Sequence, residues 1–556
     1  MGKIKIPVGR SGFADIRTNG YYFIDKSALI EELLKTDAAQ VTLITRPRRF
    51  GKTLMMSMLS EFFDIQKDSA ALFKGLKVFD NRELCDKWMN QYPTLFLSFR
   101  SVEGLNFDKA YSKLEAVVAQ CYTEQIDLLN SDRVNAYEKA FFDRIASKRA
   151  SREEIENSLF LLTKLMRAHY GRPVILLIDE YDVPLAKAND KGYYTEMLDV
   201  IRGIVQAVKD NDSLKFAIIT GCLRIAKESI FTGTNNLIAD TISDTRLNEY
   251  FGFTQREVDK LLQDTDLEVH AGEMKEWYDG YRFGNCNVYC PWDVMNYVQD
   301  LMLDSKAKPA GYWKNSSDNA VIRSFIDYSG DAITKKMEVL LSGGYIIQRV
   351  KDDLTYDYLH SSEENLWSVL YLTGYLTQME ETEAGKEIPK DSMALVIPNL
   401  EVKEIFESAI KTWFEDSSRT WDRKALFAAV WNENAEELTR EMTKLLRKTI
   451  SYHDYREDFY HAFLAGIFAG AGYNVESNRE HGEGRSDIIV QDYVGDRMAV
   501  FEVKYSRKQE ELVRDCEEAI AQIDARNYAE EFKDDYARVI CYGISFFKKR
   551  CLVFLL

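Results

Sequence analysis

The segment from residue 41 to residue 63 constrains the fold of this chain more than any other segment. Val41–Thr45 is a short run of apolar and β-branched residues, as in a buried strand, and Leu54–Phe63 carries apolar residues at helical spacing. The loop between them is basic and ends in Phe50-Gly51-Lys52-Thr53. A strand, a glycine-bearing loop and a helix in this order direct backbone N–H groups at a bound phosphate, so the sequence predicts a phosphate-binding loop.

Residues 46–53 fit the eight-residue pattern of such loops, except that Arg46 replaces the first glycine. In this pattern the lysine, here Lys52, reaches the β- and γ-phosphates, and the hydroxyl of the last residue, here Thr53, binds Mg²⁺. ATP and Mg²⁺ are therefore the expected cofactors. The loop residues expected to bind the nucleotide are Arg48, Arg49, Phe50, Gly51, Lys52 and Thr53.

A second strand-like run, Val174–Ile178, is apolar at every position and is followed by Asp179 and Glu180. Because a phosphate loop lies upstream, we expect Asp179 to hold Mg²⁺ through water or Thr53, and Glu180 to polarise the attacking water. The alternative for this acidic pair is a solvated turn at the end of a strand.

Lys215–Thr220 repeats the apolar strand pattern. At its tip, Thr220 is expected to sense the γ-phosphate, and Arg224 is expected to neutralise charge in the transition state. Ordinary strand-cap and surface roles are the alternatives for these two residues. Strands that alternate with helices in this way predict a parallel sheet with helices on both faces.

Three regions follow from the pattern along the chain. Residues 1–300 are predicted to form an α/β nucleotide-binding domain. Residues 301–450 are mainly helical, apart from a β-like patch at Met393–Pro398, and are interpreted as a connector or a winged-helix-like module. Residues 451–556 alternate helices with strands, which indicates a second α/β domain.

The last region contains a hairpin with paired carboxylates. Antiparallel pairing about a turn near Gly495 would set Asp487 opposite Glu502, with Lys504 on the same face of the sheet. Two neighbouring carboxylates repel unless a cation or a proton lies between them, so we expect Asp487 and Glu502 to bind Mg²⁺. Lys504 would orient the attacking water or help to deprotonate it. An exposed ion pair is the alternative for Glu502 and Lys504.

The N-terminal half of the chain resembles the AAA-ATPase-like family of bacterial proteins, and the resemblance implies a P-loop fold that binds ATP. Members of that family also carry arginine where other phosphate loops begin with glycine. The aromatic cluster from Trp277-Tyr278 to Tyr281-Phe283 is expected to pack as core beside the ATP site, and a base-stacking platform is the alternative. The matching segments are Tyr21–Lys26, Arg46–Thr53, Leu177–Asp182, Thr220–Gly221, Phe251–Thr254 and Trp277–Gly284.

Residues 451–556 resemble the PD-(D/E)xK nuclease superfamily, and most closely the nuclease-like domain that is fused to this ATPase-like family. The resemblance implies a Mg²⁺-dependent nuclease in which Glu457 on the preceding helix and Gln522 on the following helix complete the catalytic set. Ser486 stands where the superfamily name has proline, which leaves the metal ligands unchanged. The three residues of the hairpin are all present, so a competent site is favoured over a degenerate one.

Composition limits the alternatives. The formal charge of −17 argues against a surface that coats nucleic acid nonspecifically, because that binding mode needs many Lys and Arg residues, so any nucleic-acid contact must be local. Basic residues in the last region gather at Lys504–Lys508 and Lys548–Arg550. Eight scattered cysteines, the lack of an apolar leader in residues 1–6 and the lack of a long apolar run favour a reduced cytoplasmic protein without a membrane span.

Together these features predict an α/β domain that binds and hydrolyses ATP, a helical middle region, and a Mg²⁺-dependent nuclease domain that acts on DNA. The rival hypothesis is a STAND-like nucleotide-driven switch or scaffold whose nuclease-like domain binds a partner without cutting. The intact catalytic residues favour the enzyme, and the acidic net charge favours the rival. The sequence leaves open DNA against RNA, the biological pathway, and whether the chain forms a homo-oligomer.

Overall fold

The computed structural model describes most of the chain, and the statements below are confined to that part. The side chains of Glu457 and Asp487, two residues predicted to be catalytic, lie outside it, although the backbone of both residues is described. The described residues are 4–35, 40–225, 237–313, 322, 331–354, 362–380, 388–419, 424–449, 457–469, 471–481, 484–525, 532 and 535–556.

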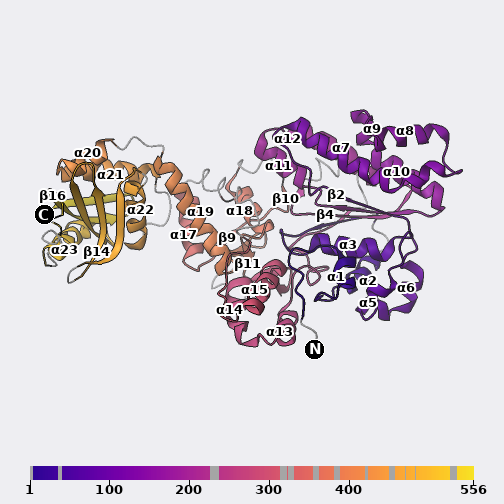
Figure 1. Cartoon of the computed structure of the whole chain (residues 1–556), viewed down its shortest axis with the longest axis horizontal. Helices are drawn as coiled ribbons and strands as arrows, with labels where there is room; N and C mark the ends of the chain where they lie inside the picture. The colour runs from indigo at the N-terminus through magenta and orange to yellow at the C-terminus, as the bar shows by residue number, and fades with distance from the viewer. Residues whose placement is uncertain are drawn as a thin grey trace. The chain divides into compact units, whose positions relative to one another are not determined.

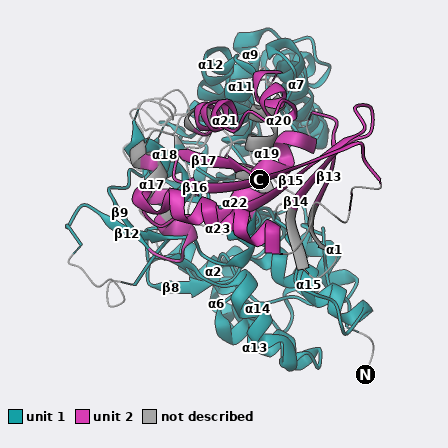
Figure 2. Ribbon diagram, turned by 90° about the vertical axis from the view of Figure 1, so that its left-hand side faces the viewer, with its two compact units in different colours: residues 1–318, 345–404 teal, residues 319–344, 405–556 magenta. Residues whose placement is uncertain are grey.

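The chain divides into two compact units, which Figure 2 colours separately. Unit 1 comprises Met1–Asp318 and Tyr345–Glu404, and unit 2 comprises Asn319–Gly344 and Ile405–Leu556. The boundaries at residues 300 and 450 that the sequence suggests divide the chain differently, and they stay a prediction. Much of the predicted middle region thus packs with the nucleotide-binding part of the chain.

Unit 1 is built on a five-stranded parallel sheet with the strand order β2-β3-β4-β1-β6. Because β4 lies between β1 and β3, the carboxyl ends of these three strands lie side by side. The strands predicted from the sequence are present, and the predicted α/β fold is confirmed. The strands are β1 (Val41–Thr45), β2 (Thr94–Ser98), β3 (Val174–Asp179), β4 (Leu214–Gly221) and β6 (Leu237–Asp240).

Helices cover both faces of this sheet (Figure 1). On one face, four helices form a single core with strand residues such as Leu95, Leu176 and Ile219. Those helices are α7 (Phe107–Glu124), α8 (Ala136–Ala146), α10 (Ser158–Tyr170) and α12 (Tyr194–Val205). The other face carries α1 (Phe13–Thr18), α2 (Ala28–Leu34) and α3 (Lys52–Phe63). Five further helices belong to this part of the unit: α4 (Ala70–Phe73), α5 (Lys77–Asp80), α6 (Arg82–Trp88), α9 (Arg152–Glu156) and α11 (Val183–Lys191).

The remainder of unit 1, which apart from β5 follows β6 in sequence, packs as a helical layer with small sheets. Its helices are α13 (Gln255–Asp264), α14 (Ala271–Tyr278), α15 (Pro291–Leu303) and α18 (Glu363–Leu372), and α19 (Leu400–Arg419) begins here. Its strands are β5 (Arg224–Ile225), β7 (Tyr281–Phe283), β8 (Cys286–Val288), β9 (Ile346–Gln348), β10 (Asp353–Leu354), β11 (Thr377–Gln378) and β12 (Met393–Val396). The predicted β-like patch is thus strand β12, the middle strand of a sheet ordered β11-β12-β9.

Unit 2 contains a second five-stranded sheet in the order β13-β14-β15-β16-β17. Neighbouring strands are antiparallel, except that β15 and β16 are parallel. Helices α20, α21 and α22 contribute to the core on one face, and α23 packs on the other face. The elements are α17 (Asp331–Leu341), α20 (Lys424–Trp431), α21 (Ala435–Thr449), α22 (Glu457–Ala469), β13 (Asn474–His481), β14 (Gly484–Asp492), β15 (Arg497–Tyr505), α23 (Leu512–Ala525), β16 (Arg538–Phe547) and β17 (Arg550–Leu555).

No helix in the described part of the chain combines the length and the apolar character that crossing a membrane requires.

Candidate functional site

The predicted phosphate loop connects β1 to α3 in unit 1. Gly51 has a φ of 83°, in the left-handed region that glycine reaches without strain, and α3 begins at the next residue, Lys52. The Nζ atom of Lys52 donates hydrogen bonds of 2.8 Å to the carbonyl oxygens of Arg46 and Pro47, so the loop's own backbone holds the ammonium. A helix N-terminus and a buried lysine at one turn are suited to binding an anion.

Asp179 is the centre of a hydrogen-bond set that joins the phosphate loop to three strand ends. Thr53 Oγ1 donates to Asp179 Oδ2 at 2.9 Å, and Thr220 Oγ1, on β4, donates to Asp179 Oδ1 at 2.6 Å. Ser98 is the last residue of β2, and its Oγ atom donates to Asp179 Oδ2 at 3.3 Å. The structure therefore brings Thr53, Asp179 and Thr220 together, and their carboxylate and hydroxyl oxygens are the kind of ligand that Mg²⁺ prefers.

Glu180 follows Asp179 directly and has an unusual backbone conformation. Its φ is 54°, in the left-handed region that residues other than glycine seldom occupy. Burial raises the pKa of its carboxyl, the charge of Asp179 raises this pKa further, and the charges of Lys52 and Arg100 oppose the rise. A carboxylate with a raised pKa is a better proton acceptor near neutral pH. Backbone strain and a shifted carboxyl at one position are features of functional sites.

Asp182 connects the end of β3 to the end of β4. Its Oδ2 atom accepts the backbone N–H groups of Cys222 and Leu223 at 2.9 and 3.0 Å, and its side chain is buried. Gly221 lies against it: a Cβ atom added there would lie 2.6 Å from the Tyr181 ring and 2.7 Å from Asp182 Oδ1. The turn after Thr220 is therefore fixed by a buried carboxyl, and only glycine leaves room for that contact.

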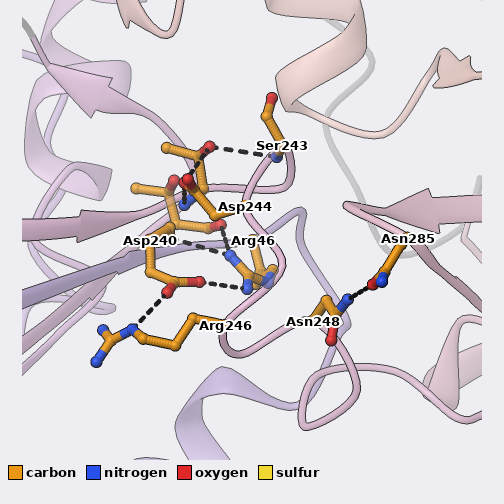
Figure 3. A network of polar contacts seen from close by, with 9 residues as sticks. Arg46, Asp240, Ser243, Asp244, Arg246, Asn248 and Asn285 are labelled. Carbon is orange, nitrogen blue, oxygen red and sulfur yellow. Dashed lines mark hydrogen bonds and ion pairs between the residues drawn. The ribbon is translucent and has the colours of Figure 1, made fainter.

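Arg46, the residue that departs from the usual loop pattern, anchors the loop to β6 (Figure 3). Its Nη2 atom donates to Asp240 Oδ1 at 2.8 Å, and its Nη1 atom donates to the carbonyl oxygens of Thr45 and Asp240 at 2.8 and 3.0 Å. Arg246 Nε donates to Asp240 Oδ2 at 3.0 Å. The side chains of Arg46 and Asp240 are 0% and 2% exposed. The charge of Arg46 is thus neutralised within the fold by Asp240.

The aromatic segment around Tyr281 packs against the phosphate loop. Phe50 is buried, and the centroid of its ring lies 4.9 Å from that of Tyr281 and 5.0 Å from that of Phe283. The guanidinium of Arg46 lies 5.5 Å from the centroid of the same Phe283 ring. The aromatic segment therefore lies beside the candidate ATP site as core. Phe50 belongs to this core, and its contact with a nucleotide stays a prediction.

The other arginines predicted to bind nucleotide lie in three different surroundings. The guanidinium of Arg49 lies 4.2 Å from the centroid of the Trp292 ring, and burial lowers the pKa of Arg49. Burial raises the pKa of the Asp182 carboxyl, and the positive charge of Arg48 is one of the smaller effects that oppose this rise. Arg224 is half-buried in β5, which pairs with β10. Direct contacts of these side chains with ATP stay predictions.

Two buried carboxyls lie close to the phosphate loop. Asp293 on α15 and Glu401 on α19 are both 0% exposed, and Glu401 Oε1 accepts the backbone N–H of Trp313 at 2.6 Å. Burial raises the pKa of both carboxyls, the charge of Asp293 raises the pKa of Glu401 further, and the charge of Arg49 lowers the pKa of Asp293. Since a low-polarity environment disfavours two neighbouring negative charges, the pair retains a proton at neutral pH.

Unit 2 places the predicted hairpin residues on β14 and β15. Ile488 pairs with Phe501 in the antiparallel register, and one further step of the same register would set position 487 opposite Glu502, as the sequence predicts. Glu502 is 0% exposed, and Lys504 Nζ lies 3.6 Å from Glu502 Oε1. The fold therefore brings Glu502 and Lys504 together, whereas the carboxylate of Asp487 lies outside the described part of the chain.

The two helix residues predicted to complete this site are placed only in part. Glu457 is the first residue of α22, and its side chain is not described. Gln522 lies half-buried on α23, and no hydrogen bond in the described part of the chain joins it to Glu502 or Lys504. Among the described residues, no group of three or more His, Cys, Asp or Glu side chains is arranged to hold a metal ion. The oxygen donors of Glu502 suit Mg²⁺, and a site shared with Asp487 stays a prediction.

Sequence reasoning missed Ser98 and Asp182. The signal for Ser98 is present in the sequence, because it ends an apolar strand just as Asp179 and Thr220 lie at the ends of theirs. Asp182 ends a segment that resembles the AAA-ATPase-like family, but no local pattern reveals its role, since the N–H groups that it accepts come from residues 40 and 41 positions later in the chain.

Two known families match this chain. Residues 7–231 match the family described as "Predicted AAA-ATPase", and residues 455–554 match the PD-(D/E)XK nuclease superfamily. The chain therefore carries an AAA-ATPase-like domain followed by a C-terminal domain of the PD-(D/E)XK nuclease superfamily, and both resemblances drawn from the sequence are confirmed. The candidate site around Asp179 lies inside the first match, and Glu502 and Lys504 lie inside the second.

A relative from Azotobacter chroococcum mcd 1 is similar along almost the whole chain. It is named "Uncharacterized protein in vnfD 5'region" and is 25% identical over 560 residues, which cover 98% of this chain and 97% of the relative. The similarity thus extends through both domains and the region between them. The relative's name states no activity.

Proposed function

We propose that unit 1 binds and hydrolyses ATP with Mg²⁺, and that unit 2 is a Mg²⁺-dependent nuclease that cleaves DNA. The proposal for unit 1 rests on the hydrogen bonds around Asp179. The hydroxyls of Thr53, the residue after Lys52, and of Thr220 both donate to its carboxylate. The second half is supported by the buried Glu502 with Lys504 at 3.6 Å, in a domain of a nuclease superfamily. The rival, a nucleotide-driven switch that binds a partner without cutting, predicts no cleavage.

In unit 1 each residue has a distinct role. Lys52 supplies a cation for the β- and γ-phosphates, and the N–H groups at the start of α3 supply further donors. Thr53 and Asp179 supply oxygen ligands for Mg²⁺, which when bound neutralises phosphate charge. Glu180 accepts a proton from the attacking water, for which its raised pKa is suited. Thr220 keeps the Asp179 carboxylate oriented through its 2.6 Å hydrogen bond.

In unit 2 the carboxylate of Glu502 is buried beside the ammonium of Lys504, and a cation stabilises a negative charge inside a protein. Lys504 supplies part of the positive charge, and Glu502 together with Asp487 supplies oxygen ligands for Mg²⁺. A bound Mg²⁺ ion would stabilise charge on the phosphate and lower the pKa of a coordinated water. Lys504 then orients the attacking water and offsets the charge that develops on the phosphate.

Calorimetric titration of the full chain with ATP and Mg²⁺ tests the first half. Lys52→Ala should weaken ATP binding about tenfold or more, because a charged hydrogen bond is worth about 1.5–3 kcal/mol. Lys209→Ala removes an exposed lysine of the same unit and should bind ATP as the wild type does. Glu180→Gln should bind ATP but hydrolyse it on the order of 10²-fold more slowly or worse. Equal ATP affinity in the wild type and in Lys52→Ala would contradict the assignment.

A cleavage assay tests the second half, with labelled single- and double-stranded DNA and RNA, in Mg²⁺ and in EDTA. Glu502→Gln and Asp487→Ala should abolish cleavage and leave ATP turnover unchanged, because metal binding is local to unit 2. If ATP controls the nuclease, Lys52→Ala should also slow cleavage, since a coupling of about 1–3 kcal/mol changes activity several-fold or more. Cleavage that is equal with ATP, with ADP and without nucleotide would exclude that control, and no cleavage of any substrate would favour the rival function.

A further inference from the structure

A cluster of basic residues lies at the carboxyl ends of β15 and β16 in unit 2. The two strands are parallel, with Tyr505 opposite Phe546, and the backbone N–H of Ser506 donates to the carbonyl oxygen of Phe546 at 2.8 Å. One basic stretch leaves β15 directly after Ser506, and the other forms the turn between β16 and β17. Residues far apart in the sequence therefore meet at one end of the sheet. We call Arg507, Lys508, Lys548 and Arg550 the strand-end cations.

No ion pair among the described residues gives the strand-end cations a counter-charge. All four are exposed, and none of them forms an ion pair with any other described residue. The carboxylate of Glu511 accepts the backbone N–H of Lys508 at 3.2 Å instead of pairing with its ammonium. Like charges within about 8 Å, the Debye length at physiological salt, repel one another. The formal charge of the chain is −17, but the surface at this cluster is locally positive. An external anion would stabilise such a surface.

Buried aromatic side chains fix the backbone of the cluster. Tyr460 on α22 stacks on Phe546, with ring centroids 4.2 Å apart, and its hydroxyl donates to the carbonyl oxygen of Lys548 at 3.0 Å. Tyr460 is 0% exposed. The turn that carries Lys548 is thus positioned before any partner binds, which lowers the entropic cost of binding.

The cluster adjoins the candidate nuclease site. Glu502 and Lys504 lie on β15, a few residues before Arg507 and Lys508. The strand-end cations lie just beyond the carboxyl ends of β15 and β16, which pair in parallel, so they lie at the same end of the sheet. An extended polyanion that passes Lys504 toward that end of the sheet would therefore meet cations that follow β15 and cations of the β16–β17 turn.

We propose that the strand-end cations bind the phosphate backbone of the nucleic-acid strand that unit 2 cleaves, beside the scissile phosphate. This inference rests on the proposed nuclease function and adds a binding surface that is separate from the catalytic residues. Contacts from Lys and Arg to phosphates position a strand without reading its bases, so the surface sets the path of the strand and not its sequence. Each phosphate that is neutralised on duplex DNA steepens the dependence of affinity on salt by about 0.9 in a log–log plot.

The test is fluorescence anisotropy of labelled DNA and RNA oligonucleotides with the full chain in EDTA, where cleavage does not interfere. The strand-end variant is Arg507→Gln/Lys508→Gln/Lys548→Gln/Arg550→Gln. The control variant, Lys74→Gln/Lys77→Gln/Lys109→Gln/Lys209→Gln, removes four exposed lysines of unit 1 and changes the net charge equally. Loss of four phosphate contacts should lower the salt slope by about 3.6, so that raising the salt from about 50 to 200 mM weakens binding about 10²-fold less than in the wild type.

The control variant should keep the wild-type affinity and salt slope, and melting curves of both variants show that they are folded. Equal losses in the two variants would overturn the proposal, as would an unchanged salt slope in the strand-end variant. If the strand-end variant binds like the wild type while the wild type cleaves DNA, the surface is wrong and the nuclease function stands. If binding depends on the cations but wild type and Glu502→Gln both fail to cleave, the nuclease function is wrong and the surface stands. Binding to phosphatidylserine vesicles or polyglutamate in place of nucleic acid would also overturn the proposal.

Discussion

Asp240→Asn should destabilise unit 1 strongly, because it leaves the Arg46 guanidinium buried without a counter-charge. Arg46 is 0% exposed and lies 2.8 Å from Asp240 Oδ1. Two unit charges about 4 Å apart interact by about 4 kcal/mol at an effective dielectric constant of about 20, and removing one partner of a buried pair costs about 3–5 kcal/mol. In Arg46→Met, Asp240 keeps its ion pair with Arg246 at 3.0 Å, so the free energy of unfolding should fall by less than in Asp240→Asn, by about 1–3 kcal/mol.

Amide hydrogen exchange of the full chain at increasing urea concentration measures these losses. Peptides from β1 and α3, read by mass spectrometry, report unit 1 without the signal of unit 2. The matched control is Asp143→Asn, which removes the same charge from an ion pair with Arg149 whose side chains are 58% and 64% exposed, and which should cost less than about 1 kcal/mol. A loss for Asp240→Asn as small as that for Asp143→Asn would refute the reasoning, and so would a larger loss for Arg46→Met.

Ser98→Ala removes the 3.3 Å hydrogen bond to Asp179 and should slow ATP turnover less than tenfold, whereas Thr220→Val removes the 2.6 Å bond and should slow it more. Gly221→Ala puts a Cβ atom 2.6 Å from the Tyr181 ring and should cost about 1–3 kcal/mol in urea unfolding, while Gly272→Ala, with nothing within 4 Å, should be neutral or stabilising. Burial raises the pKa of Glu401 in the folded state above its unfolded value of about 4.3. The protonated form therefore stabilises the fold fully below about pH 4.3. This stabilisation is lost as the pH rises toward the folded-state pKa, by up to about 1.4 kcal/mol per pH unit. The side chain in Glu401→Gln stays neutral, so the free energy of unfolding of the variant should rise relative to that of the wild type between about pH 5 and pH 8. A difference between the two proteins that does not change with pH would contradict the raised pKa.

Strands β1, β3 and β4 and the β14–β15 hairpin could be predicted because their signals are local. Every residue of β3 is buried, and its sequence is apolar up to Asp179, so the strand is recognisable without its neighbours. The turn between β14 and β15 fixes the register of the hairpin, so the pairing of Ile488 with Phe501 follows from a local signal, and the place of Asp487 opposite Glu502 stays a prediction. In both cases residues close in sequence decide the geometry.

The contacts that the sequence did not reveal join residues far apart in the chain. Arg46 and Asp240 are 194 positions apart, and the partners Trp313 and Glu401 are 88 positions apart. Neither pair belongs to a short motif, and the identity of a residue as arginine does not show whether its side chain is buried or exposed. Burial and charge pairing depend on which elements pack together, and a single sequence shows no register between distant helices and strands.

Arginine at the first position of the phosphate loop changes how the loop is held in place. The backbone N–H of Arg46 donates to the carbonyl oxygen of Gly221 at 3.1 Å, and its carbonyl oxygen accepts a hydrogen bond from Lys52. Its side chain reaches Asp240 on β6. One residue therefore ties the loop to the strand end that carries Thr220, to the phosphate-binding lysine and to the edge of the sheet. Since displacement of Arg46 must move the carbonyl that holds Lys52, Asp240→Asn should weaken ATP binding even in molecules that remain folded, whereas Asp143→Asn should leave it unchanged.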